Sequence, residues 1–275
     1  MKHHRPRLLF LLAVLCLAVC LLAGCAARAA TADPDADLPT IVIGSDSYPP
    51  FNYLSADGQP TGIDVELATE AFRRMGYKAQ FVTIDWVDKK ELVENGTVDC
   101  LWGSFTMTGR EDLYQWAGPY LYSRQMVLVR ADSDIATLAD LAGKRVAVQA
   151  TSKPETVFLE RPEPERVPEV GEVYCFSTME EVYSAIRKGF VDAIAGHEGA
   201  MRTFMEDSPG SWRILDQSLM VSGLGVAFPK GTNESLSAQL TAVLQEMQKD
   251  GTTKAIVEKY GFDPDQFFLG RGGSS

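Results

Sequence analysis

Short apolar runs alternate with amphipathic segments along the chain from residue 40 onward. Apolar residues in short unbroken or alternating runs favour strands, and apolar residues at helical spacing favour helices. In the first half, this pattern predicts strands at residues 41–44, 79–84 and 98–103 and helices at 62–76 and 89–95. Alternation of this kind is typical of α/β folds, in which helices cover sheets.

The same alternation is repeated in the middle of the chain, so we expect two similar lobes, each a mainly parallel sheet flanked by helices. Apolar residues at helical spacing also predict two helices near the C-terminus, separated at Gly251. The predicted strands of the middle part are 145–149, 172–176 and 191–195, the helices there are 137–141, 152–160 and 179–188, and the late helices are 233–249 and 252–260.

Two apolar stretches, 124–130 and 219–228, have the character of extended strands that cross from one lobe to the other. If both cross, lobe 1 is built from residues 39–126 and 223–270 and lobe 2 from residues 127–222. Two such connections would form a hinge. The last five residues, 271–275, lack periodicity and are expected to be disordered.

The first residues have the pattern of a secretion signal. Lys2, Arg5 and Arg7 form a basic segment, and residues 8–22 form an apolar run of about 15 residues. A membrane-spanning helix needs roughly 20 residues, so the run fits a signal peptide over 1–24 better than a permanent span.

The apolar run ends in the residues LAGC at 22–25, which resemble the bacterial lipobox. In that motif the cysteine, here Cys25, receives lipid and becomes the first residue of the mature protein. The alternative is ordinary cleavage at the small residues 27–30. Residues 25–38 are small, polar and aperiodic, and are expected to form a flexible tether.

The composition is acidic, with 26 basic and 37 acidic residues. Without the signal peptide the formal charge falls to −14, since only 23 basic residues remain against 37 acidic ones. A chain this acidic, without a basic cluster, is not expected to bind nucleic acid. About 240 residues after the signal suggest one large or two small domains.

Two cysteines, Cys100 and Cys175, belong to the predicted globular part. Each lies beside strand-like residues, so two buried thiols are favoured over a disulfide, although a disulfide stays open. No spacing of cysteine and histidine suggests a metal site, and we expect neither a metal nor a cofactor.

Arg110 is the residue that most needs a functional explanation. It follows the predicted strand at 98–103 together with the hydroxyl residues Ser104, Thr106 and Thr108. Hydroxyl groups, free backbone donors and a guanidinium suit a planar carboxylate, and ligands of open α/β folds bind beyond the carboxyl ends of strands. The alternative is a surface arginine that pairs with Glu111 or Asp112.

At these and other places the sequence resembles the family 3 solute-binding proteins of amino-acid ABC importers, over about residues 40–262. Each matching stretch alone is weak, but their order along the chain is specific. The stretches are YPPF at 48–51, GIDVELA at 62–68, GTVDC at 96–100, the Thr–Arg element ending at Arg110, GPY at 118–120, LAGKRVAVQ at 141–149, GFVDA at 189–193, GT at 251–252 and KYG at 259–261.

The resemblance implies a periplasmic-binding-protein type II fold, in which two lobes joined by two hinge strands close on a ligand. It assigns Arg110, Ser104 and Thr106 to the ligand carboxylate, with Thr151 and Ser152 donating from lobe 2 at a helix N-terminus. The family's threonine–arginine spacing is one residue shorter here, so either Thr106 or Thr108 could face the ligand. The lobe 2 loop at residues 149–152 is shorter as well.

The resemblance also implies apolar walls around the ligand side chain, formed by Tyr48, Phe51 and Trp102. Each of these aromatic residues could instead belong to the core. Asp64 is expected to orient the following helix rather than to touch the ligand.

The family usually places an aspartate that pairs with the ligand ammonium where this chain has His197, followed by Glu198. A buried ammonium needs an anionic partner. Either Glu198 or Asp46 supplies the charge, or the ligand is not a simple α-amino acid. His197 itself could accept one hydrogen bond.

The resulting hypothesis is a lipid-anchored binding component of an ABC importer that acts as a monomer on the extracytoplasmic face of the membrane, in the periplasm if an outer membrane exists. Its partners would be the permease and its ATPase subunits. A polar amino acid is the favoured ligand, ahead of cystine, a basic amino acid, a dipeptide or an opine-like compound. The alternatives are a ligand-sensing protein and a dehydratase-type enzyme, although we expect no enzymatic activity.

Overall fold

The structure is a computed structural model, and it describes residues 38–268. The predicted signal peptide, the predicted lipidation site Cys25, almost all of the predicted tether and the tail at 271–275 lie outside these residues. The predicted domain boundaries stay predictions. Within the described part, no helix is long and apolar enough to cross a membrane.

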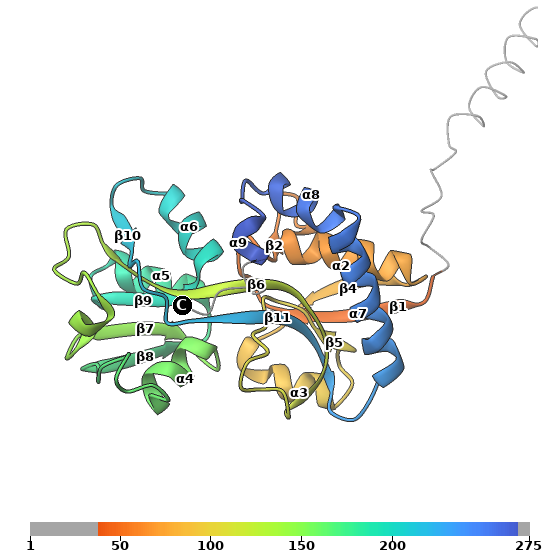
Figure 1. Ribbon diagram of the computed structural model, residues 1–275, viewed down its shortest axis with the longest axis horizontal. Coiled ribbons are helices and arrows are strands. Elements are labelled where there is room, and N and C mark those ends of the chain that lie inside the picture. The colour runs from red at the N-terminus through yellow and green to blue at the C-terminus, as the bar shows by residue number, and fades with distance from the viewer. Residues whose placement is uncertain (1–37, 269–275) are drawn as a thin grey trace, which may run out of the picture. The chain divides into compact units, whose positions relative to one another are not determined.

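A nine-stranded mixed sheet runs through both lobes in the order β4-β1-β5-β11-β6-β9-β7-β8, with β10 also paired to β6 (Figure 1). A separate two-stranded hairpin, β2–β3, was not predicted. The strands are β1 (Thr40–Ser45), β2 (Tyr53–Leu54), β3 (Pro60–Thr61), β4 (Lys78–Thr83), β5 (Cys100–Leu101), β6 (Tyr114–Arg130), β7 (Arg145–Gln149), β8 (Glu172–Phe176), β9 (Ala193–His197), β10 (Trp212–Ile214) and β11 (Met220–Pro229).

Each lobe contains three parallel strands, so the predicted fold class is confirmed. In lobe 1, β1 pairs in parallel with β4 and β5. In lobe 2, β7 pairs in parallel with β8 and β9. The carboxyl ends of these strands carry the loops that lie between the lobes.

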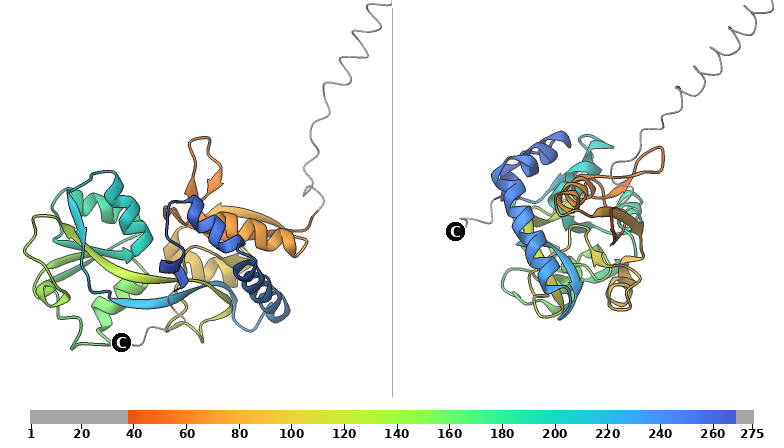
Figure 2. Two further views of the ribbon diagram at one scale, coloured as in Figure 1. Left: turned by 45° about the horizontal axis from the view of Figure 1, so that its top comes forward. Right: turned by 90° about the vertical axis from the view of Figure 1, so that its right-hand side faces the viewer.

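Strands β6 and β11 connect the two lobes and pair with each other in antiparallel orientation (Figures 1 and 2). β6 starts at Tyr114, ten residues before the predicted stretch, and continues through Gly118 and Pro119. Pro119 argues against a strand on sequence alone, because proline cannot donate to a ladder. The Gly118 amide bonds the Thr241 hydroxyl at 3.0 Å, so its hydrogen bond is made outside the sheet.

The helices lie where apolar spacing predicted them, with two additions. α6 and α9 were not predicted, and β9 ends two residues later than expected because the apolar run continues through Gly196. The helices are α2 (Ile63–Arg74), α3 (Lys89–Glu94), α4 (Lys153–Glu160), α5 (Met179–Arg187), α6 (Glu198–Glu206), α7 (Glu234–Lys249), α8 (Thr252–Lys259) and α9 (Asp265–Phe268), with the 3₁₀ helices η1 (Trp86–Asp88) and η2 (Leu138–Leu141).

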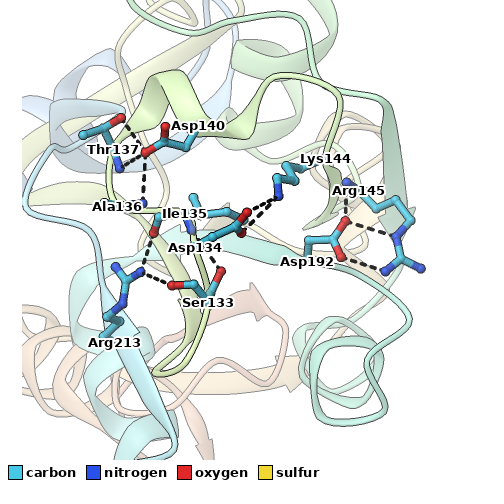
Figure 3. Close-up of polar contacts among 10 residues, drawn as sticks. All are labelled: Ser133, Asp134, Ile135, Ala136, Thr137, Asp140, Lys144, Arg145, Asp192 and Arg213. Atoms are coloured by element: carbon cyan, nitrogen blue, oxygen red, sulfur yellow. Dashed lines mark hydrogen bonds and ion pairs between the residues drawn. The ribbon is translucent and has the colours of Figure 1, made fainter.

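Polar contacts fix the loops of lobe 2 around η2 and β7 (Figure 3). Asp140 accepts hydrogen bonds from the amide and hydroxyl of Thr137 at 2.8 and 2.9 Å, which caps η2. Arg145 pairs with Asp192 at 2.7 Å and so ties β7 to the start of β9. These contacts are half-buried or exposed, so they position the loops and add little stability.

The two cysteines of the described part differ in burial. Cys100 is fully buried in β5, whereas Cys175 in β8 is exposed, so the prediction of two buried thiols is wrong for Cys175. Both are free thiols in the structure.

Candidate functional site

Eight of the eleven predicted ligand residues line a narrow cavity of about 40 Å³ between the lobes. Lobe 1 contributes the end of β1 and the loop that follows β5, and lobe 2 contributes the β7–α4 loop and the end of β9. The lining residues are Asp46, Tyr48, Trp86, Gly103, Ser104, Phe105, Thr106, Arg110, Gln125, Gln149, Thr151, Ser152, Lys153, Pro154, Met179, Ala195, Gly196 and His197.

The loop after β5 presents Ser104 and Thr106 to the cavity, and both side chains are buried. Ser104 has a left-handed backbone with φ of 50°, and its amide donates to the buried carboxylate of Asp64 at 2.6 Å. Asp64 lies in the first turn of α2, and its hydrogen bond to Ser104 holds the loop after β5 in place. Burial raises the pKa of Asp64 to about 7.

Thr106, and not Thr108, faces the cavity. Thr106 is 2% exposed and its hydroxyl accepts a 3.4 Å hydrogen bond from Gln125. Thr108 is exposed and its hydroxyl donates to Ser222 at 3.0 Å. The shortened threonine–arginine spacing thus leaves Thr106 as the available hydroxyl.

We expect Thr106→Val to weaken ligand binding by about 3- to 10-fold, because it removes one hydrogen-bonding hydroxyl at nearly constant volume. Thr108→Val is the matched control, and its affinity should equal that of the wild type. Isothermal titration of both variants would check this, and equal effects at the two positions would contradict the assignment.

Arg110 is half-buried with its guanidinium at the cavity. Its Nη1 donates to the Thr106 carbonyl oxygen at 3.2 Å, and its Nη2 donates across the cleft to the Thr151 carbonyl oxygen at 3.0 Å. Within residues 38–268 it forms no ion pair, so the alternative pairing with Glu111 or Asp112 is not made. Burial lowers the pKa of Arg110, but not enough for a guanidinium to lose its charge.

Thr151 and Ser152 line the cavity, but their backbone amides are already in use. The Thr151 amide donates to Glu155 at 2.7 Å, and the Ser152 amide donates to the Gln149 carbonyl oxygen at 3.3 Å. Thr151 instead presents its carbonyl oxygen to Arg110. The short loop causes this, since Thr151 adopts a left-handed conformation with φ of 58°.

His197 lines the cavity at the end of β9 and is 8% exposed. Its Nδ1 lies 2.9 Å from the Ser123 hydroxyl, and its amide donates to the Tyr48 hydroxyl at 3.0 Å. Burial lowers the pKa of His197 to about 3, so the ring is neutral near pH 7.

Glu198 does not line the cavity, which corrects its prediction as a ligand residue. Its carboxylate bonds Arg124 at 2.6 and 2.8 Å and Arg202 at 2.6 and 3.0 Å. Because β9 extends through His197, Glu198 becomes the first residue of α6 and points to these arginines. Its charge is therefore already compensated.

Asp46 is the carboxylate among the cavity-lining residues of the described chain. Gln149 donates to it across the cleft at 2.5 Å. Burial raises the pKa of Asp46 to about 6, and nearby Lys89 opposes that rise. Lys89 also bonds the Thr151 hydroxyl at 2.6 Å, so direct contacts between the lobes flank the cavity.

The predicted aromatic walls are only partly present. Tyr48 lines the cavity, whereas Phe51 and Trp102 are fully buried and lie in the core. Phe51 packs behind Tyr48 and His197, with ring centroids 6.1 and 5.9 Å away. Trp102 packs on Phe72 and Tyr120, so the prediction of a wall role is wrong for both residues.

Sequence reasoning missed five polar or aromatic residues of the cavity: Trp86, Phe105, Gln125, Gln149 and Lys153. Trp86 follows β4 by three residues, and an aromatic residue after a strand could have suggested an apolar wall of the ligand site. Gln125 is the uncharged polar residue of the stretch at 124–130, which is otherwise apolar between its terminal arginines, and this is a local signal of a functional position.

Two α/β lobes joined by two strands, with converging polar side chains between them, define a two-lobe binding protein of the periplasmic type II class. Within residues 38–268, no cluster of three or more metal-ligating side chains could hold a metal ion. A profile of the bacterial extracellular solute-binding proteins, family 3, matches residues 41–263. The chain belongs to this family.

Characterised relatives and a solved structure extend the comparison. The L-cystine-binding protein TcyJ of Escherichia coli (strain K12) is 28% identical, over 80% of this chain and 82% of its own length. The histidine-binding periplasmic protein of Salmonella typhimurium is 30% identical, over 82% and 89%. An ancestral arginine-binding protein bound to arginine superposes with a TM-score of 0.73 at 27% identity, covering 80% of this chain and 97% of that protein.

Proposed function

We propose that this chain is the ligand-binding component of an ABC importer and that it captures an amino acid, most readily a polar one, between its lobes. The observation that supports this most is Arg110, a cavity-lining cation without a carboxylate partner in the described part of the chain. A guanidinium has five N–H donors, and its two backbone bonds leave three for a ligand carboxylate. The cystine-, histidine- and arginine-binding relatives support an amino-acid ligand.

Capture would couple ligand binding to closure of the lobes. Arg110 and Lys89 bond Thr151, and Gln149 bonds Asp46, across the cavity. A cavity of about 40 Å³ leaves little more room than one water molecule, so a ligand must enter a more open arrangement. Its carboxylate would then replace the Thr151 carbonyl oxygen on Arg110, and contacts from both lobes would favour the closed form.

Delivery would require partners encoded by other chains. The closed form would dock on the membrane permease, whose ATPase subunits drive transport. We propose that lipid on Cys25 anchors the protein as a monomer to the extracytoplasmic face of the membrane. The sequence at 22–25 supports this anchor, and mass spectrometry of the purified N-terminus would test it.

A thermal-shift screen of the purified protein against the free amino acids and their Nα-acetylated forms would test the function. A ligand at 100 times its dissociation constant stabilises a protein by about 2.7 kcal/mol, which raises the melting temperature by several degrees. We expect at least one amino acid or amino-acid derivative to give this shift and to be recovered chemically unchanged. A lack of stabilisation by every amino acid and derivative would contradict the proposal, and steady turnover would favour the dehydratase alternative.

A further inference from the structure

The wall of the cavity beside Arg110 carries polar but uncharged side chains. Gln125 Nε2 lies 3.0 Å from His197 Nε2 and 3.4 Å from Thr106 Oγ1, and Arg110 bonds the carbonyl oxygen of Thr106. Because His197 is buried and neutral, this wall has no charge near pH 7. A substituent next to a carboxylate held by Arg110 would face these neutral groups.

Gln125 adds an unpaired hydrogen-bond acceptor to this wall. Its side chain is 1% exposed and lines the cavity, and its Oε1 has no hydrogen-bond partner among the described residues. Leaving a buried acceptor unpaired is unfavourable, because the group has lost its hydrogen bond to water without replacement. An N–H group on the ligand would satisfy it, and a neutral amide N–H suffices.

A positively charged group beside Gln125 and His197 would find no anionic partner among the side chains of this wall. Glu198 is the next residue after His197, but its carboxylate is held by Arg124 and Arg202 outside the cavity. Burying an unpaired ammonium is costly. The neutral wall therefore disfavours a free ammonium on the carbon that bears the carboxylate.

The negative charge of the site lies elsewhere, where the cavity meets a larger groove of about 560 Å³. Asp46, Trp86 and Met179 line both the cavity and the groove, whereas Arg110 lines only the cavity. Asp85 and Glu180 also line the groove. A positive charge on the ligand is thus best placed away from Arg110, at Asp46.

We propose that the site selects an elongated carboxylate that has a neutral N–H donor at its α position and its positive charge at a distance, beside Asp46. Nα-substituted amino acids and dipeptides with a distal ammonium have this chemistry. This inference rests on the proposed function and narrows its ligand class.

Two isomers of acetylated lysine test the inference directly. Nα-acetyl-L-lysine keeps only the distal ammonium, and Nε-acetyl-L-lysine keeps only the α-ammonium, so they differ in charge position but not in composition. We expect Nα-acetyl-L-lysine to bind about 10- to 100-fold more tightly by isothermal titration, since each factor of ten corresponds to about 1.4 kcal/mol. Equal affinities or the reverse order would overturn the inference.

The variant His197→Asp places a negative charge on the neutral wall, and His197→Asn is its uncharged counterpart. We expect His197→Asp to shift the preference toward Nε-acetyl-L-lysine by at least tenfold, while His197→Asn keeps the wild-type order. An unchanged order in a folded His197→Asp protein would overturn the role of His197. If that variant does not fold, Asp46→Asn should abolish the preference for the Nα-acetyl isomer, and a preserved preference would overturn the role of Asp46.

The two proposals fail in different ways. If free amino acids stabilise the protein and neither acetylated isomer binds, the inference about the neutral wall is wrong while the proposed function stands. If no amino acid or derivative binds, the proposed function is wrong as well.

Discussion

Replacing Arg110 by alanine is expected to lower ligand affinity about 100- to 1,000-fold, because truncating one partner of a buried charged pair costs about 2–5 kcal/mol. Arg110 lines the cavity, and its other contacts are two backbone carbonyl oxygens and the Phe105 ring. The variant should remain folded, since burial of the guanidinium is itself unfavourable, as its lowered pKa indicates.

Isothermal titration with the ligand found by thermal shift would measure the loss, and circular dichroism would show whether the fold persists. Arg110→Lys keeps the charge but not the planar fork, so it should bind with intermediate affinity. Glu111→Gln is the matched control on the same loop and should bind like the wild type. Retained affinity in a folded Arg110→Ala protein would refute the carboxylate assignment.

Replacing Glu198 by glutamine is expected to destabilise the protein by about 3 kcal/mol while leaving ligand affinity within about threefold. The Glu198 side chain is 9% exposed and bonds both Arg124 and Arg202, which would face each other without it. Removing one partner of a buried pair costs about 3–5 kcal/mol, and the arginines are exposed enough, at 34% and 47%, to reach water and reduce that cost.

Urea denaturation followed by circular dichroism would measure this loss, and a titration would measure affinity. Glu206→Gln is the matched control, because Glu206 is the exposed last residue of the same helix, α6. A large loss of ligand affinity with unchanged stability would mean that Glu198 binds the ligand after all.

These two variants separate a proposed ligand residue, Arg110, from a residue with structural contacts, Glu198, which the sequence could not distinguish. Arg110 and Glu198 are both charged residues beside predicted strands, and both were candidates for ligand contact. In the structure, one reaches the cavity and the other is compensated by two arginines. The difference arises because β9 extends two residues farther than the apolar pattern predicted.

The direct contacts between the lobes also come from residues that are far apart in the chain. Lys89 and Thr151, and Asp46 and Gln149, meet only because β6 and β11 hold the lobes side by side (Figure 1). Local sequence patterns carry no information about such pairs. For the same reason, Phe51 and Trp102 could not be separated from Tyr48, since burial of an aromatic residue depends on what packs on it.

The sequence by itself determined the fold class, the two strand–helix repeats and the crossing strands, because apolar periodicity reports directly which face of each element is buried. It also singled out the loop after β5, with Ser104, Thr106 and Arg110, as a candidate site, because ligands of open α/β folds bind beyond the ends of strands, and these three residues line the cavity. Only the tertiary structure decided that Thr106 rather than Thr108 faces the cavity, that Glu198 turns away and that Gln125 and His197 form a neutral wall. Those choices depend on which side chains meet across the lobes, and contacts between distant segments are set by packing rather than by local pattern.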